Sequence, residues 1–328
     1  MAVHLLWAAP SGRTETPGKK LPAPTPTASP EVVTVGIWPS VIYNIDLSAN
    51  SYSMAAYVWF LWKGDLDPTK TVEFDNNVDS ANFSKVPNYP QPITLPDGRH
   101  YQCLRVEGKF FQAYNLQRFP LEDHTLNLIV DENTYSRKTI VYKFDSHDSG
   151  VDAAVNIPGW RIKEWIGTDE TEHYPTNFGD PTFGSKSSDY AMIRFQVIVT
   201  RPVNYFIFKM MLPLMIILLA NWTALFLHPK ETQTRIGLSG TALLTTVFLQ
   251  QGYSSNLPVT YLVLMDKIYV VAFILIVASL IQEVIQSLIA KRVGAEAAAR
   301  ALWIDTTSVI VQITIFAVSV AVFIVKTR

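Results

Sequence analysis

Long apolar stretches dominate the second half of the chain. Four nearly uncharged stretches follow one another, at 205–227, 236–265, 268–289 and 306–325. Lys209 and Glu283 are the only charged residues within them. A helix needs about 20 mostly apolar residues to cross a bilayer core of roughly 30 Å, and so little polar sequence could not cover a soluble core. The pattern predicts four transmembrane helices, at 205–227, 235–252, 262–289 and 303–325.

The preceding part of the chain follows a different period. Apolar residues recur at every second position in four stretches, at 33–37, 57–62, 126–130 and 193–199. This period is typical of strands that bury one face. Asp97 and Gly98, between such segments, suit a tight hairpin turn. The pattern predicts an immunoglobulin-like antiparallel β-sandwich over 31–202, followed by a membrane α-helical domain over 203–328.

Residues 1–30 fit neither domain. Six prolines stand there among Thr, Ala, Ser and Gly, which predicts a disordered or cleaved segment. Residues 3–9 form a short apolar stretch with no charge before it, so they make a weak signal peptide. Because the β-domain is expected to be exported, some export signal is still required.

Composition excludes several classes of protein. The net charge of −1 argues against binding of nucleic acid. The single cysteine, Cys103, excludes an intrachain disulfide and a multi-cysteine metal centre. The six histidines are scattered without metal-like spacing, and neither a phosphate-binding loop nor a nucleophile motif is present. We therefore expect no metal, no cofactor and no enzymatic activity.

Charges in the loops predict the orientation in the membrane. The first and third loops are basic, with Lys230, Arg235, Lys291, Arg292 and Arg300, whereas the second, near 252–260, has no charge. The positive-inside rule places the basic loops in the cytoplasm and the β-domain outside. The basic end of the chain, 326–328, then lies outside, against the rule. We expect a multi-pass protein of the cell (inner) membrane, in contact with lipid.

The predicted helix at 235–252 contains many polar residues. Polar groups inside a bilayer are costly unless they face water or partners. At about 100° per residue, five positions lie within about 40° of one line: Gly237, Thr241, Leu244, Phe248 and Gln251. Several copies around an axis would enclose a water-filled pore whose Leu and Phe rings close it by dewetting. Alternatively, the hydroxyls bond neighbouring helices and the glycines permit close packing.

Short motifs follow one another in a specific order. They are Leu95-Pro-Asp-Gly-Arg99, Phe119-Pro120-Leu121-Glu122, Arg201-Pro202 before the first helix, Pro213 within it, and Asn256-Leu257-Pro258 after the second. With these motifs, residues 31–328 resemble the prokaryotic pentameric ligand-gated ion channels, the branch of the Cys-loop receptor superfamily that lacks the paired cysteines. The resemblance implies a homopentamer, in which four identical subunits join each chain.

The resemblance has departures that bear on ion selectivity. The Trp-x-Pro of the first binding loop reads 85–87 Lys-Val-Pro here, and Glu122 replaces an Asp. Cation-selective members carry an acid at the cytoplasmic start of the pore helix, and Glu231 is the candidate here, about one turn before Arg235. The Pro-Ala-Arg sequence of anion channels is absent. We expect selectivity for monovalent cations, with anion selectivity as the alternative.

The resemblance implies an aromatic agonist site between neighbouring β-domains. By position its residues are Trp38 and Tyr57 on the complementary face, Asp131 and Asn133 on the principal face, and Tyr174, Phe178 and Tyr190 around the loop at 166–190. Aromatic faces attract an ammonium by about 0.5–2 kcal/mol, and Asp131 would add a charge-assisted hydrogen bond. This favours a small amine. The alternative is that Trp38 and Tyr57 are ordinary core residues.

The resemblance also implies residues that couple the β-domain to the pore: Asp46, Phe119, Pro120, Glu122, Arg201, Asn256 and Pro258. Protons are a second candidate agonist, because histidines titrate near neutral pH and burial shifts acids. A membrane-anchored binding or sensor protein is one rival hypothesis, but it does not explain the polar stripe. A membrane enzyme is another, but Asp266, Glu283 and Asp305 are expected to be isolated.

Overall fold

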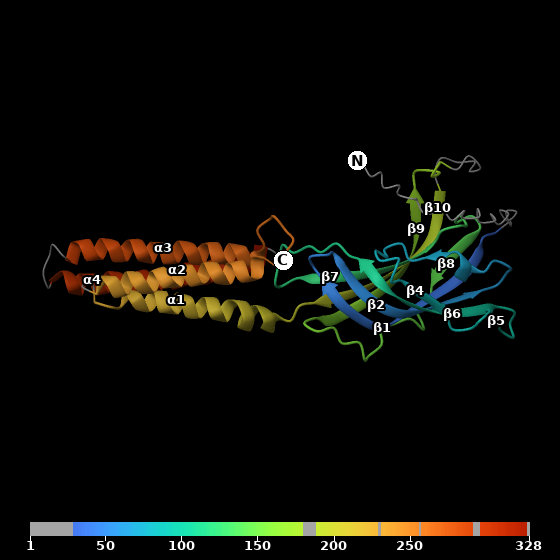
Figure 1. Cartoon of the computed structure of the whole chain (residues 1–328), viewed down its shortest axis with the longest axis horizontal. Helices are drawn as coiled ribbons and strands as arrows, with labels where there is room; N and C mark the ends of the chain where they lie inside the picture. The colour runs from blue at the N-terminus through green and yellow to red at the C-terminus, as the bar shows by residue number, and fades with distance from the viewer. Residues whose placement is uncertain (1–28, 180–187, 229–230, 256, 291–295, 327–328) are drawn as a thin grey trace, which may run out of the picture.

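The computed structural model describes residues 29–179, 188–228, 231–255, 257–290 and 296–326. A β-sandwich and a bundle of helices lie end to end along the longest axis of the molecule (Figure 1). The predicted order, a sandwich followed by membrane helices, is confirmed. The segment expected to be disordered or cleaved lies almost wholly outside the described residues.

Two sheets form the sandwich. Their strands are β1 (Glu31–Asp46), β2 (Ser51–Trp62), β3 (Val72–Glu73), β4 (Ser84–Pro87), β5 (Ile93–Thr94), β6 (His100–Phe111), β7 (Asp123–Glu132), β8 (Ile140–Phe144), β9 (Arg161–Tyr174) and β10 (Ser188–Thr200). The six-stranded sheet has the order β4-β6-β2-β1-β8, with β5 beside β6, and the four-stranded sheet has the order β3-β7-β10-β9. The strand pairs named here are antiparallel, as expected, except β1–β8, which is parallel. Parallel neighbours need a crossover, which here passes through the second sheet.

Alternate residues of the long strands fill the space between the sheets. In β2, Val58 and Phe60 are fully buried, whereas Tyr57 and Trp59 between them are only partly buried on the outer face. The predicted turn at Gly98 is confirmed, because its φ of 80° is the left-handed conformation that glycine favours and its N–H donates to the Leu95 carbonyl oxygen.

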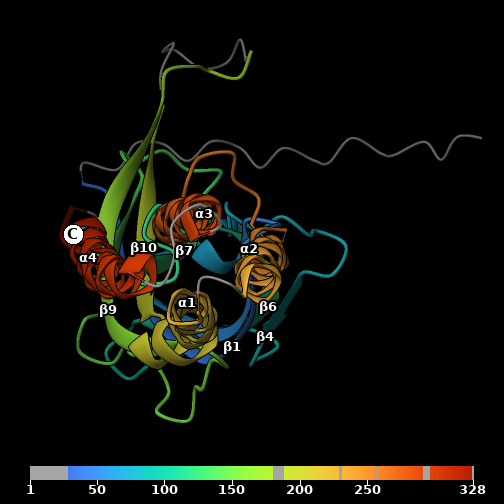
Figure 2. The same ribbon diagram turned by 90° about the vertical axis from the view of Figure 1, so that its left-hand side faces the viewer.

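The bundle contains a π-helical segment, η2 (Tyr205–Met211), and the helices α1 (Leu212–Leu225), α2 (Thr232–Ser254), α3 (Leu264–Ala290) and α4 (Glu296–Lys326). Figure 2 views the bundle end-on. Among the described residues, three spans are long and apolar enough to cross a membrane, Tyr205–Leu225, Leu264–Ile289 and Trp303–Lys326. Helix α2 is long enough but is not among them, because its polar residues lower its hydropathy.

Candidate ligand site, coupling interface and pore helix

Helix α2 has one buried and one exposed face. Four side chains turn into the bundle and are buried: Arg235, Ser239, Ala242 and Thr246. The five residues of the predicted pore stripe are all exposed: Gly237, Thr241, Leu244, Phe248 and Gln251. At about 100° per residue, the two sets lie on opposite sides of the helix. Leu244 is 56% and Phe248 66% exposed in the single chain, so nothing in its own bundle covers the stripe at this level.

Hydroxyl groups on the two faces of α2 bond differently. On the exposed face, Thr241 donates to the Gly237 carbonyl oxygen and Thr245 to that of Thr241, each at 2.8 Å. On the buried face, Ser239 donates to Glu283 of α3, also at 2.8 Å. Thr246, also on the buried face, donates to the carbonyl oxygen of Ala242 in its own helix at 2.7 Å. Of these four hydroxyls, only that of Ser239 bonds to a neighbouring helix.

Arg235 lies inside the bundle and is 1% exposed. Its Nη2 lies 3.4 Å from both carboxylate oxygens of Asp305 on α4. Gln282 and Gln286 of α3 donate to Asp305 Oδ1 at 2.6 and 2.7 Å. The expectation that Asp305 is isolated is therefore wrong. An unpaired charge in an apolar bundle is costly, and this cost favours the pairing.

The other two acids expected to be isolated also have partners. Glu283 accepts from Ser239, and Asp266 accepts from the Tyr253 hydroxyl and from the backbone N–H of Val263. None of these contacts assembles a group of three or more metal-ligating side chains within the described residues. The exposed Glu231 is the N-cap residue of α2, whereas the charge of Arg235 is directed into the bundle.

Three aromatic side chains gather at one end of the β3-β7-β10-β9 sheet. The centroid of the Tyr174 ring lies 5.1 Å from that of Phe178 and 5.9 Å from that of Tyr190, and both pairs are edge to face. Burial, and then the negative charge of nearby carboxylates, raises the pKa of Tyr174 to about 12. Those carboxylates are Asp131, Asp75, Glu172 and Glu73. Aromatic faces combined with carboxylates form a site suited to a cation.

Asp131 is enclosed beneath this site and is 6% exposed. Its carboxylate accepts from the backbone N–H of Glu132 at 2.9 Å. Burial raises the pKa of Asp131 to about 7, and repulsion from Asp75 and Glu172 contributes to the rise. In the single chain the side chain is covered, so a ligand at the surface would meet its charge and not an open hydrogen-bond acceptor.

The exposed acid Glu73 completes the edge of the site. It accepts from Asn133 at 2.9 Å, which places Asn133 in the same group. The segment 85–87, which stands in place of the first binding loop, lies on β4 in the other sheet. Its Lys85 Nζ nevertheless donates to the carbonyl oxygen of Val72 at 3.1 Å, beside Glu73 on β3, so this segment reaches the same edge of the site. The carboxylates missed by sequence reasoning, Glu73, Asp75 and Glu172, belong to segments far apart in the chain and leave no shared local pattern.

Trp38 and Tyr57 lie on a different face of the molecule. They are paired across β1 and β2 in the six-stranded sheet, and both are partly exposed. Neither belongs to the buried core, so the alternative that they are core residues is wrong. A Cβ at Gly150 would lie 2.9 Å from the Trp38 ring, so this ring packs against backbone. Trp38 and Tyr57 are not brought to Tyr174 within one chain.

Glu122 and Arg201 form an ion pair where the sandwich meets the bundle. Arg201 Nε lies 2.7 Å from Glu122 Oε1, and both side chains are nearly buried. The guanidinium carbon lies 4.3 Å from the ring centre of Trp160 and 4.9 Å from that of Tyr205. The aromatic rings shield the pair from solvent, so its attraction is screened less than that of an exposed pair.

Main-chain hydrogen bonds join the same loop of the sandwich to the start of α3. Leu264 N–H donates to the Gln117 carbonyl oxygen at 3.0 Å, and Met265 N–H donates to that of Phe119 at 3.3 Å. The Phe119 ring stacks on Tyr253 near the end of α2, with centroids 6.1 Å apart. This loop, which also contains Pro120, therefore contacts both α2 and α3.

The other expected coupling residues lie around this interface. Asp46 caps the turn after β1 by accepting from the backbone of Ser48 and Ala49, each at 2.9 Å. The next residue, Leu47, lines a cavity of about 470 Å³ together with Phe119, Arg201 and residues of α2. Pro258 is exposed between α2 and α3. Asn256 lies outside the described residues.

Similarity to known proteins agrees with this architecture. No family model matches the chain. The chain is 23% identical over 278 residues to a proton-gated ion channel of Gloeobacter violaceus, covering 79% of this chain and 72% of the relative. It is also 23% identical to a pH-sensitive chloride channel 2 of Drosophila melanogaster over 190 residues, and to a human gamma-aminobutyric acid receptor subunit gamma-3 over 189 residues. At this low identity, the chain is similar to members of the pentameric ligand-gated ion channel superfamily.

These relatives are ion channels rather than enzymes. Each of the latter two matches covers 57% of this chain and only 36% and 38%, respectively, of the relative. The chain thus spans little more than a third of the length of those two curated relatives. Chloride channels and a proton-gated channel both occur among the relatives, so similarity does not select an ion or an agonist.

The chain also carries a buried histidine beside the ion pair of Glu122 and Arg201, which sequence reasoning missed. His124 is 5% exposed and its Nε2 has no hydrogen-bond partner among the described residues. Nε2 lies 3.9 Å from Glu122 Oε1, and the ring packs against Tyr114 and Trp160. Burial, and then repulsion by Arg201, lowers the pKa of His124 to about 4, although Asp123 opposes the change.

We expect His124→Gln to reduce the acid sensitivity of the fold. The pKa of His124 is below its usual value of 6.5, so the unfolded chain takes up the proton first and the free energy of unfolding falls as pH drops from about 6.5 to about 4. The loss amounts to up to about 3 kcal/mol. Thermal unfolding of the purified protein at several pH values across this range measures it. His173→Gln, at an exposed site, is the control, and an equally steep acid loss in His124→Gln contradicts the prediction.

Proposed function

We propose that the protein is a ligand-gated ion channel in which five identical chains surround a pore lined by α2. The observation that carries this proposal is the face of α2 opposite its buried residues. That face is polar at both ends and carries the exposed Leu244 and Phe248 in the middle. A pore narrowed by a ring of such residues conducts ions when water fills it and closes when the water leaves. Agonist binding would shift the population toward the wet arrangement.

The agonist proposed for this channel is a small amine. The cluster of Tyr174, Phe178 and Tyr190 with its carboxylates would form the principal half of the site. Trp38 and Tyr57, on the outer face of the other sheet, would form the complementary half on the neighbouring chain. This separation explains why the two halves do not meet within one chain. Ammonium groups suit both the aromatic faces and the negative charge.

Selectivity for monovalent cations is proposed from the charges at one end of α2. Glu231 is exposed there, while Arg235 is buried and paired with Asp305. An exposed ring of carboxylates attracts cations. A guanidinium that is buried and paired contributes little to the electrostatic potential along the pore axis. The proposed location is the cell (inner) membrane, crossed several times, with the sandwich on the outer side.

Current recorded under a NaCl gradient tests the proposal. The full chain is expressed, its presence at the surface is established, and a panel of primary amines is applied under voltage clamp. We expect an evoked current that reverses near the sodium equilibrium potential. Reversal near the chloride potential refutes cation selectivity but keeps the channel. Silence to every amine and every pH step, with protein at the surface, favours an anchored binding protein instead.

We expect Asp131→Asn to raise the half-activating amine concentration about tenfold. The same substitution should remove the dependence of that concentration on pH. The pKa of Asp131 is about 7, so its negative charge is gained as pH rises from 6 to 8, whereas an alkylamine stays protonated over that range. The half-activating amine concentration of the wild-type channel should therefore fall with rising pH. Dose–response curves at several pH values measure this. Asp65→Asn, exposed and away from the site, is the control, and identical shifts in both variants contradict the assignment.

Protons are the second candidate agonist. Two buried groups of the β-domain, Asp131 and His124, have pKa values of about 7 and about 4, so both titrate on acidification. The relative from Gloeobacter violaceus is a proton-gated ion channel. Current evoked by pH steps without amine favours protons over an amine as the agonist if Asp131→Asn or His124→Gln abolishes it.

A further inference from the structure

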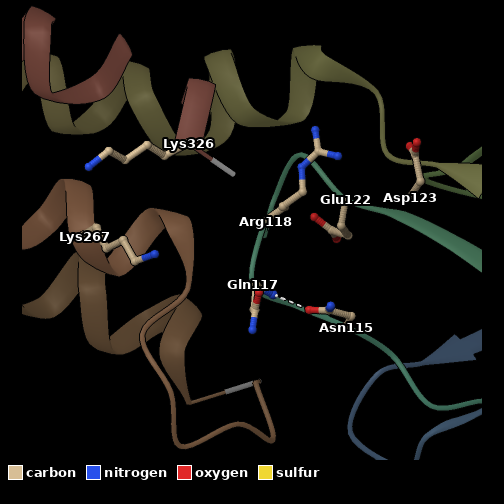
Figure 3. Close-up of a pocket in the computed structure, with 7 residues that line it drawn as sticks. All are labelled: Asn115, Gln117, Arg118, Glu122, Asp123, Lys267 and Lys326. Atoms are coloured by element: carbon tan, nitrogen blue, oxygen red, sulfur yellow. Dashed lines mark hydrogen bonds between the residues drawn. The ribbon is translucent and has the colours of Figure 1, made fainter. Parts of the chain in front are cut away.

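Strand β7 runs from the bundle to the candidate ligand site. It begins beside a polar cavity of about 530 Å³, which Glu122 and Asp123 line where the sandwich meets α3 and α4 (Figure 3), and it ends at Glu132. Glu132 has no exposed surface, although a carboxylate is costly to bury unless hydrogen bonds stabilise it. The function proposed above makes no use of this acid. Its partners indicate what it does.

Four neutral groups donate to the Glu132 carboxylate. The backbone N–H groups of Thr134 and Tyr135 donate to Oε1 at 3.0 and 3.1 Å. The hydroxyls of Thr71 and Tyr142 donate to Oε2 at 2.7 and 2.9 Å. The two oxygens of a carboxylate accept about four hydrogen bonds, so this side chain is fully satisfied. A glutamine has a single acceptor oxygen and could not accept all four.

The four donors come from three segments of the chain. Two belong to the segment directly after β7, and Thr71 directly precedes β3. The fourth, Tyr142, lies on β8 in the other sheet. Burial raises the pKa of Tyr142 well above its usual value, and the adjacent charge of Glu132 adds to the rise, so this hydroxyl keeps its proton and donates. Glu132 therefore ties both sheets together at this end of the sandwich.

The segments tied by Glu132 carry the polar residues of the candidate ligand site. Glu73 follows Thr71 by two positions and pairs with Asp131 across β3 and β7. Strand β3 has only two residues, so its own hydrogen-bond ladder holds it weakly. The N–H of Asn133, in the segment after β7, donates to the Thr71 carbonyl oxygen at 3.3 Å. Loss of the Glu132 carboxylate would therefore loosen β3 and the segment after β7 together.

We propose that Glu132 is a positioning residue of the agonist site. It is buried beneath the site and does not touch the ligand, but it fixes the spacing of Glu73, Asp131 and Asn133. Binding sites of this kind need their polar groups held within about 0.5 Å of the productive geometry. The inference rests on the proposed function, because it concerns the site proposed there for a small amine.

Dose–response curves for propylamine, recorded from the full chain, test this role. We expect Glu132→Ala to raise the half-activating concentration at least about tenfold, because hydrogen bonds to a charged group are strong. Glu132→Gln keeps one acceptor oxygen and should recover part of the loss, and Tyr142→Phe, which removes one bond, should raise the concentration about threefold. The maximal current per channel at the surface and the reversal potential should stay unchanged, because the pore keeps its lining.

A second buried tyrosine provides the matched control. Tyr52 also lies on the six-stranded sheet without exposed surface, and its hydroxyl donates across the core to the Asn127 carbonyl oxygen of β7 at 2.5 Å. Tyr52→Phe should leave the half-activating concentration within about twofold of that of the wild-type channel. An equal shift in Tyr52→Phe and Tyr142→Phe overturns the proposal, and so does an unchanged concentration in Tyr142→Phe. Tyr142→Phe keeps the bulk of the ring, so it decides the matter even if Glu132→Ala does not fold.

Amide hydrogen exchange of the purified full chain separates this role from the proposed function. Exchange at 71–73 and 133–135 should be faster in Glu132→Ala and in Tyr142→Phe than in the wild type, with exchange in the bundle unchanged. A wild-type protein that is silent to propylamine refutes the proposed agonist, and exchange then decides the role of Glu132 alone. Equal exchange of the two segments in all variants overturns the anchoring, even in a channel that responds to amines.

Discussion

Replacement of Leu244 by serine is expected to lower the half-activating agonist concentration by at least about tenfold. Leu244 lies on the exposed face of α2, opposite the buried residues, and a ring of leucines there would exclude water from the closed pore. Serine hydrates readily, so it removes part of the free-energy gain of the dry, closed arrangement without touching the ligand site. Dose–response curves of wild-type and Leu244→Ser channels measure the change, together with current in the absence of agonist.

The control for this prediction lies on the same helix. Leu238 is also exposed, but at about 100° per residue it lies well away from the centre of the stripe. Leu238→Ser should leave the half-activating concentration within about twofold of that of the wild-type channel. An effect of Leu238→Ser equal to that of Leu244→Ser contradicts the assignment of the pore-facing residues.

Replacement of Asp305 by leucine is expected to reduce the free energy of unfolding by about 3–5 kcal/mol. The substitution leaves Arg235 buried without its carboxylate partner, and Gln282 and Gln286 lose their acceptor. Arg235 Nε and Nη1 already lack partners among the described residues. Thermal unfolding of the purified protein and its abundance at the cell surface measure the loss.

A second substitution distinguishes charge from packing. Arg235→Met combined with Asp305→Leu removes both charges and should recover most of the stability, since an apolar pair can replace a buried ion pair. Thr314→Leu, at an exposed position of the same helix, is the control and should change stability by no more than about 0.5 kcal/mol. Full stability in Asp305→Leu alone, or no recovery in the double variant, contradicts the pairing.

Local periodicity explains which parts of the fold could be predicted. A half-buried strand repeats every two residues, so the alternation around Val58 and Phe60 predicts a strand before any partner is known. An amphipathic helix repeats about every 3.6 residues, so the exposed face of α2 was also visible in the sequence. The parallel pairing of β1 with β8 could not be predicted, because its register depends on residues far apart in the chain.

The candidate sites were predictable to a lesser extent. Aromatic residues such as Tyr174 and Tyr190 were identified through resemblance, but Glu73 was not, because only the folded sheet brings β3 beside them. The pairing of Arg235 with Asp305 could have been inferred, since a charge within a membrane bundle requires a partner. His124 was likewise predictable, because alternation along β7 turns it toward the interior with Leu126 and Leu128.

The contact between the sandwich and α3 has a consequence for how such a joint withstands mutation. Its two hydrogen bonds use the N–H groups of Leu264 and Met265 and carbonyl oxygens of the facing loop, so no side chain makes them. Exchange of one side chain for another of similar bulk leaves these atoms in place. Alanine substitution of Leu264 or Met265 should therefore leave these two hydrogen bonds intact, whereas a backbone ester at either position would weaken them. A contact made by main-chain atoms can therefore persist while the side chains at these positions change.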